Sequence, residues 1–407
     1  MSGTSHGVRP SRLILLILIA AGGASILSTD LYAPSLPHLP AYFGTDAETV
    51  QLTMALNMAS FAIAQLFWGP LSDRFGRRAI FITGMAAFAL TVLGAALAQS
   101  IDQLLAARTL MGAAASVEAV VVLAVIGDLY RSEESAKVFA LYGMTIALVP
   151  AVGPVIGGYV FEWFGWRANF YLLTGVVLLV LAFGVARLPE TLARADRVPL
   201  RLGSIVAGYA RMLARGGFVS VALALGVAIG AIFGYITEAP FLLIDKHGVA
   251  TRHYGVFQGI IVLAFFFGSL VANRVVERIG VRRLFAAGVW SGSLSGLLVL
   301  LAVWMGETPL TLTAAMSVFA FALGPLFSSA PVIAFGRVED LGRGMSAAVL
   351  STFEMGGGAL GALFVSTTHD GSAWPLAFCV AGCAALLLVS GIAALRPNWA
   401  TEMGKFS

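Results

Sequence analysis

Long apolar tracts, interrupted by short polar segments, run through the whole of this 407-residue chain. The tracts approach or exceed the length of about 20 apolar residues that a helix needs to cross a bilayer. We therefore expect an all-α integral membrane protein with twelve spanning helices, at 12–34, 48–70, 79–98, 101–127, 136–161, 168–187, 217–244, 253–275, 283–304, 310–335, 344–367 and 373–394.

The same pattern argues against other structural classes. Hydrophobic residues make up 59% of the chain and charged residues 11%, against roughly 25% charged in soluble domains. Strands of a membrane barrel would alternate apolar and polar residues over about ten positions, and these tracts do not. No convincing small-residue cleavage site follows the first tract, so we interpret it as a span and not a signal peptide. The 46 glycines are spread through the tracts, as expected where membrane helices approach closely.

The longest polar break, 188–216, divides the tracts into two groups of six. Its second part is arginine-rich and amphipathic, which suits a helix lying along the inner membrane surface. We expect an N-terminal six-helix bundle (1–187), a cytoplasmic linker (188–216) and a C-terminal six-helix bundle (217–407).

The two halves also resemble each other in sequence. One shift lays "SDRFGRRAIFITG" (72–84) over "VERIGVRRLFAAG" (276–288), and the same shift lays "GPVIGG" over "GGALGA". A shift two residues longer lays "LYAPSLP" over "TEAPFLL". Duplicated six-helix halves, with the substrate site between them near the membrane midplane, are an architecture of secondary transporters. We therefore predict two pseudo-symmetric bundles.

The net charge of +4 indicates how the chain is oriented in the membrane and does not indicate a nucleic-acid partner. With the N-terminus inside, nearly all Lys and Arg residues fall in predicted cytoplasmic segments; the exceptions are Arg108, within a helix, and Arg167, Lys246 and Arg252, outside. The positive-inside rule then places both termini in the cytoplasm. The basic residues would face anionic lipid headgroups, and no nucleic-acid partner is expected.

Ionisable side chains inside the spans are candidates for function, because each costs about 2.5–3.5 kcal/mol on insertion scales. Asp30 and Arg108 have opposite charges and comparable depths in the outer part of the membrane, so we expect them to pair directly or through water. Such a pair can fix helix packing, or it can bind a proton and substrate. All five histidines, His6, His38, His247, His253 and His369, fall in predicted loops or tails. If protons drive this protein, carboxylates must carry them.

Three further carboxylates are candidates for a substrate cavity. Glu118 lies ten residues after Arg108 on the same predicted helix and can border the same cavity. Glu238 is either a charge at the outer rim or a substrate contact. Glu354 is mid-helix in "STFEMGGGALG", among glycines that permit close approach. The rest of the pocket would be apolar, although each residue can equally belong to the core or the lipid face: Met54, Met144, Phe233, Tyr235, Phe257 and Phe353.

Little in the sequence indicates an enzyme or a receptor. The chain has no G-x-x-x-x-G-K-[ST] motif for ATP, and no nucleophile–base arrangement. Its two cysteines, Cys379 and Cys383, lie four apart on one predicted helix and are interpreted as small packing residues. We expect no cofactor and no metal. A receptor or scaffold would need a recognition domain, and the loops are too short to supply one.

Three motifs resemble those of a known family. "GPLSDRFGRR" matches the signature between the second and third helices of the major facilitator superfamily, at Gly69, Leu71, Asp73, Arg74, Gly76, Arg77 and Arg78. "RTLMGAAAS" resembles its fourth-helix signature, built around Arg108. "GPVIGG" resembles the core of its antiporter motif, at Gly153, Pro154, Gly157 and Gly158, although the upstream glycines are replaced in "MTIALVPAV". The chain is similar to twelve-helix drug–proton antiporters of this superfamily.

Within that superfamily, "STDLYAPSLPHLPAYFG" and "SAWPLAFCVAG" resemble the Bcr/CflA group. Members export bicyclomycin, phenicols and other small drugs. The resemblance implies a bacterial inner-membrane protein, for which a monomer is sufficient, with Asp30 and Arg108 in the substrate and proton site. It also implies that the signature around Asp73 is a cytoplasmic latch between bundles, closed in the outward-open state.

We therefore expect proton-coupled efflux of small drug-like molecules by alternating access. The alternatives are a proton-coupled exporter or symporter of a metabolite, amino acid or sugar. The acidic residues favour cationic substrates, whereas the phenicols exported by the similar group are neutral, and the sequence leaves this choice open.

Overall fold

The computed structural model describes residues 12–130, 132–200, 202–341 and 343–396. Helices account for nearly all of these residues, and none of them lies in a strand. The two terminal segments, 1–11 and 397–407, lie outside the described residues, so the expected cytoplasmic position of both termini stays a prediction.

Twelve helices are long and apolar enough to cross a membrane, which confirms the predicted all-α membrane fold. They are α1 (Arg12–Asp30), α3 (Ala47–Phe75), α4 (Arg77–Leu97), α5 (Ile101–Leu129), α6 (Ser132–Phe164), α7 (Trp166–Arg187), α9 (Gly216–Pro240), α10 (Thr251–Ile279), α11 (Val281–Trp304), α12 (Pro309–Gly336), α13 (Arg343–Thr368) and α14 (Trp374–Leu395). Short elements complete the chain: η1 (Ala33–His38), α2 (Leu39–Phe43), η2 (Arg194–Asp196), α8 (Leu202–Leu213), the π-helical turn η3 (Phe241–Lys246) and η4 (Glu339–Leu341).

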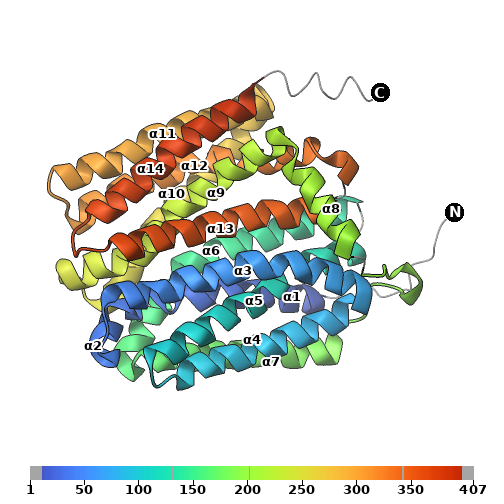
Figure 1. Ribbon diagram of the computed structural model, residues 1–407, viewed down its shortest axis with the longest axis horizontal. Helices are drawn as coiled ribbons and strands as arrows, with labels where there is room; N and C mark the ends of the chain where they lie inside the picture. The colour runs from blue at the N-terminus through green and yellow to red at the C-terminus, as the bar shows by residue number, and fades with distance from the viewer. Residues whose placement is uncertain (1–11, 131, 201, 342, 397–407) are drawn as a thin grey trace.

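The helices form two groups that follow the order of the sequence. Figure 1 shows α1 and α3 to α7 in the lower half of the view and α9 to α14 in the upper half. We call these groups the N-terminal and C-terminal bundles. They meet where α3 packs along α13 and where α6 packs along α10.

The two ends of the molecule differ in charge. We call the side of the molecule where α1 begins and α14 terminates the inner end, because it carries the arginine-rich segment around α8 (Figure 1). The opposite side is called the outer end. α8 lies where a surface helix was expected in the linker. Its Tyr209 hydroxyl donates to the Leu66 carbonyl of α3 at 2.8 Å, and Gly208 lies against the Met345 side chain of α13. α8 therefore touches both bundles at the inner end.

Several helices run beyond or stop short of the predicted apolar tracts. α3 continues to Phe75, past the predicted end at 70, because the polar residues of the signature extend the helix until Gly76, whose φ of 102° breaks it. α10 ends in the same way at Gly280, with a φ of 80°. Both turns need the left-handed conformations that glycine adopts without strain. The sequence repeat around Gly76 and Gly280 thus forms the same kind of turn in each bundle.

Candidate functional site

Arg108 is held in the interior of the N-terminal bundle. Its side chain is completely buried, and its Nη1 donates to the Ser28 carbonyl of α1 at 2.7 Å. The Nη2 atom lies 3.3 Å from the Met54 sulfur of α3, and the guanidinium stands 4.7 Å from the centre of the Tyr32 ring. The Asn57 amide donates to the Arg108 carbonyl at 2.7 Å. The cation is therefore fixed by α1, α3 and the segment that follows α1.

Asp30 ends α1 and is almost fully buried, with 3% of its surface exposed. Its Oδ2 atom has no hydrogen-bond partner among the described residues. A Cβ atom placed on Gly153 of α6 would lie 2.6 Å from the Asp30 Cβ, and the carboxyl interacts electrostatically with Tyr254 of α10. In the described part of the chain no ion pair joins Asp30 to Arg108. The expected direct pairing is absent from this conformation, because Asp30 packs against α6 while Arg108 is bonded to the Ser28 backbone.

The glycines of the antiporter-type motif bring α6 against two other helices. A side chain at Gly157 would run into the Leu31 backbone at the end of α1. A Cβ on Gly158 would lie 2.6 Å from the Thr251 carbonyl, at the start of α10. On the facing helix, Gly255 has no room for a Cβ beside the backbone of Pro154 and Val155. The motif thus lies at a backbone-to-backbone contact between the two bundles, next to Asp30.

Glu118 forms a second buried polar group around α1. Only 6% of its surface is exposed, and it accepts a hydrogen bond from the Tyr142 hydroxyl of α6 at 3.0 Å. Its side chain also bonds the Ser25 hydroxyl of α1. Asp30 of α1 and Glu118 of α5 therefore both lie against α6, the helix of the antiporter-type motif.

Glu354 lies on α13 and is partly exposed. Gly358, one helical turn further on and on the same face, leaves space that the Met58 side chain of α3 fills. Glu354 therefore occupies the side of α13 that faces the N-terminal bundle, as expected of a residue that borders the space between bundles.

The structure excludes one of the two interpretations of Glu238, that of a charge at the outer rim. Its side chain is completely buried, and both carboxylate oxygens are occupied, one by Gln51 at 2.8 Å and one by His369 at 2.8 Å. Sequence reasoning missed His369 and Gln51, because neither a loop histidine nor a lone glutamine has a spacing that identifies its distant partner.

The large apolar candidates have mixed surroundings. Met54 touches Arg108, Tyr235 is buried near Tyr254, and Phe233 borders Gly358. Met144 is 51% exposed, and Phe257 and Phe353 are partly buried. Their roles as substrate contacts stay predictions.

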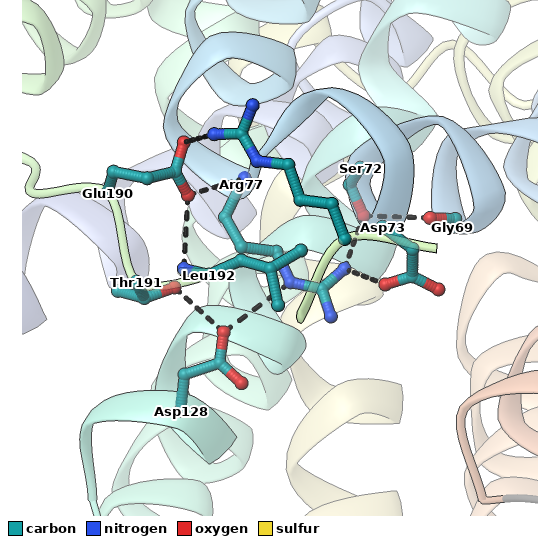
Figure 2. Close-up of polar contacts among 9 residues, drawn as sticks. Gly69, Ser72, Asp73, Arg77, Asp128, Glu190, Thr191 and Leu192 are labelled. Atoms are coloured by element: carbon teal, nitrogen blue, oxygen red, sulfur yellow. Dashed lines mark hydrogen bonds and ion pairs between the residues drawn. The ribbon is translucent and has the colours of Figure 1, made fainter. Parts of the chain in front are cut away.

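The signature between α3 and α4 forms a polar network at the inner end, shown in Figure 2. Arg77 is at its centre: Nη1 pairs with Asp73 at 2.6 Å and donates to the Ser72 hydroxyl, and Nε lies 3.4 Å from Asp128 of α5. The Arg77 backbone N–H donates to Glu190 of the linker at 2.9 Å.

Other members of the signature complete or border this network. The Ser72 hydroxyl donates to the Gly69 carbonyl, and Arg78 donates to the Val185 carbonyl of α7. Gly76 leaves no room for a side chain beside Glu190 and Arg197, and Arg74 is exposed. The network thus joins α3, α4, α5 and the linker.

Comparisons with known proteins agree with these features. The family model of the Major Facilitator Superfamily matches residues 18–268. The chain is 27% identical to a bicyclomycin resistance protein homolog of Haemophilus influenzae, over 92% of this chain and 95% of the relative. It is 30% identical to a chloramphenicol resistance protein of Pseudomonas aeruginosa, over 86% and 83%, and 29% identical to the multidrug transporter MdfA of Edwardsiella piscicida, over 80% and 79%.

Solved structures share the fold. A D-xylose–proton symporter superposes with a TM-score of 0.73 at 15% identity, covering 94% of this chain and 97% of the other. A bacterial homolog of the human lysosomal transporter Spinster, in an inward-facing and occupied conformation, gives 0.73 at 16% identity, covering 95% and 97%. The twelve-helix fold, the signature between α3 and α4 and the family match together show that this multi-pass membrane transporter belongs to the major facilitator superfamily.

Proposed function

We propose that this transporter exports small drug-like molecules in exchange for protons, by alternating access between its two bundles. The names of its relatives point to resistance against bicyclomycin, chloramphenicol and several drugs. The proposal places the protein in a bacterial inner membrane with both termini in the cytoplasm, acting as a monomer among anionic lipids.

The buried carboxyl of Asp30 carries the proposal. Its unpartnered oxygen lies beside the antiporter-type glycines of α6 and close to Tyr254 of the other bundle. A carboxyl without a partner in a low-dielectric site favours the protonated form, and hydration favours the charged form. Opening the outer end would separate α10 from α6 and hydrate Asp30. A cycle that alternately buries and hydrates this group can therefore bind and release a proton.

Arg108 and the neighbouring carboxyls would select the substrate. Both terminal nitrogens of Arg108 have partners, and its Nε has none among the described residues. Asp30 ends α1, to which Arg108 is bonded, and Glu118 bonds the same helix. Glu354 lies on the side of α13 that faces the N-terminal bundle, so all three carboxyls can supply negative charge to a drug bound here. We propose that drug entering from the inner end contacts this region together with Met54, Phe233 and Tyr235.

Asp30→Asn tests the proposal in proteoliposomes with an imposed pH gradient. We expect drug transport driven by the gradient to fall to background, because asparagine cannot bind a proton, while the protein remains folded. Asp102→Asn removes an exposed carboxylate from the first turn of α5 and should transport normally. Full coupling in Asp30→Asn would show that Asp30 has only a packing role.

The direction and range of transport separate the alternatives. A symporter of a sugar or metabolite would take up protons in the same direction as its substrate, and an amino-acid or metabolite exporter would protect cells against one class of compound. A drug exporter should confer resistance to unrelated compounds. A resistance profile across cationic dyes, phenicols and bicyclomycin distinguishes cationic from neutral substrates.

A further inference from the structure

Glu238 is a buried carboxylate at the outer contact between the bundles, and among the described residues no hydrogen bond or ion pair joins it to Arg108, Asp30 or Glu118. Its Oε2 accepts from the amide of Gln51, on α3 of the N-terminal bundle, at 2.8 Å. Its Oε1 lies 2.8 Å from Nδ1 of His369, which follows α13 in the C-terminal bundle. Since a carboxylate can only accept, Nδ1 of His369 carries the hydrogen in this bond. The Gln51 nitrogen is also 3.3 Å from that Nδ1, so the three side chains meet.

We propose that Gln51, Glu238 and His369 form a proton-binding outer latch, in which a proton on His369 favours closure of the outer end. The proposal rests on the proposed alternating access but assigns these residues no part in binding drug or in the proton exchange at Asp30.

The proton favours closure because the Glu238 carboxylate needs a counter-charge when the outer end closes over it. When the outer end closes, Gln51 covers Glu238 and leaves it with no exposed surface. A buried carboxylate is strongly destabilising unless a counter-charge accompanies it. Protonated His369 supplies that charge at hydrogen-bonding distance. When the outer end opens, water can hydrate Glu238 and the need for the counter-charge disappears.

His369 can exchange protons with the outside while the latch is closed. Its side chain is 15% exposed, in contrast to Glu238. It lines a cavity of about 290 Å³ at the outer end, together with Phe241, Leu242, Asp245, Lys246 and Gly371. The imidazole therefore stands between the buried carboxylate and an outer cavity.

Other charged and titratable groups surround the latch. Asp245 and Lys246 face His369 across the cavity, and Asp370 adjoins it. The Cys379 thiol of α14 lies close to Glu238. From the N-terminal bundle, Glu48 of α3 has an exposed side chain and a backbone carbonyl that accepts from Ser366 at 2.8 Å. The acidic groups outnumber the single lysine, so their sum also favours a positive imidazole.

The pH dependence follows from the pKa of His369. The hydrogen bond to Glu238 raises this pKa above its ordinary value, partial burial opposes the rise, and the charges of Glu238, Asp370 and Asp245 add to it. A raised pKa in the closed state means that proton binding stabilises closure. The stabilisation should be complete below about pH 6.5, the ordinary value, and should be lost as the pH rises through the raised value.

Distances between spin labels across the outer end provide the test. Labels are attached at Ala41→Cys of α2 and Met305→Cys after α11, which are exposed and belong to different bundles. The two cysteines of the chain are replaced in this background, as Cys379→Ala and Cys383→Ala. We expect the short-distance population to grow at acidic pH. The closed-to-open ratio should change by about tenfold, the effect of one hydrogen bond to a charged group.

Two variants should shift this curve in opposite directions. Glu238→Gln needs no counter-charge, so the outer end should stay closed at every pH. His369→Gln leaves Glu238 without a cation, so the closed population should fall to the same low value at every pH. His253→Gln, the matched control, removes an exposed histidine at the same end and should follow the parent curve.

The possible failures are distinguishable. If both latch variants follow the parent pH curve, the latch is wrong and alternating access stands. If the outer distance never changes, even with saturating drug or in Gly255→Ala, where backbone crowding opposes closure, both the latch and alternating access are overturned.

Discussion

The outer and inner ends of the transporter use their polar side chains differently. At the outer end, hydrogen bonds and an ion pair join the bundles: Gln51 to Glu238 at 2.8 Å, Ser366 to the Glu48 carbonyl at 2.8 Å, and Arg252 to Glu162 at 3.1 Å. His38 and Thr251 add a contact of 3.0 Å. At the inner end, the bonds of Arg77 to Asp73, Asp128 and Glu190 remain within the N-terminal bundle and the linker.

This difference indicates which end is closed. The signature around Asp73 resembles a latch between bundles, yet in this conformation its carboxylate pairs with Arg77, four residues away. α3 and α13 remain bonded further toward the membrane centre, through Gln65 and Thr352 at 3.2 Å. We propose that the conformation has a closed outer end and a disengaged signature. In the opposite state Asp73 would face a helix N-terminus of the other bundle, a contact worth about 0.3–1 kcal/mol or more when partly buried.

Among the contacts at the two ends, the largest effect is expected from crowding the outer contact. Gly255→Ala places a Cβ against the backbone of Pro154 and Val155, and overpacking of this kind typically costs about 1–3 kcal/mol. We expect transport in proteoliposomes to fall about tenfold, because the outer end cannot close fully. Gly143→Ala adds the same methyl group to α6 in open space and should transport normally. Normal transport by Gly255→Ala would refute the claim that this contact must form.

A smaller effect is expected at the inner end. Asp73→Asn removes the charge that would hold the inner end closed, so transport should slow by several-fold while the range of drugs stays the same. Initial transport rates and a binding assay with two unrelated drugs provide the measurement. Glu339→Gln, an exposed inner carboxylate of the other bundle, is the matched control. A changed drug range with an unchanged rate would place Asp73 in the binding site instead.

The smallest effect should follow from an ion pair that does not cross between bundles. Arg215 and Asp340 pair at 2.8 Å at the inner end, with half-exposed side chains. Exposed pairs contribute about 0–1 kcal/mol. Asp340→Asn should therefore leave the transport rate unchanged and lower the thermal midpoint by a few degrees at most. A large loss of transport would show that a contact within one bundle can matter for transport as much as a contact between the bundles.

Much of the fold was predictable, because membrane spans follow from the length of apolar tracts alone. The turn at Gly76 and its repeat at Gly280 were also visible as matching sequence. The partners of the buried charges were not. Glu238 is 187 residues from Gln51 and 131 from His369, and such pairs depend on how the bundles pack. Counting residues along the helices predicted that Asp30 and Arg108 lie at similar depth in the membrane. The position of the Asp30 side chain, however, is determined by its close packing against Gly153 of α6.

Paired distance measurements across both ends test the central claim most directly. The outer pair is Ala41→Cys with Met305→Cys, and the inner pair is Ala186→Cys of α7 with Asn273→Cys of α10, all at exposed positions. Both are measured in the same lipid and pH, with and without a transported drug. We predict that drug lengthens the outer distance and shortens the inner one by matching fractions of the population. Distances that change together in the same direction, or a change at one end alone, would contradict alternating access.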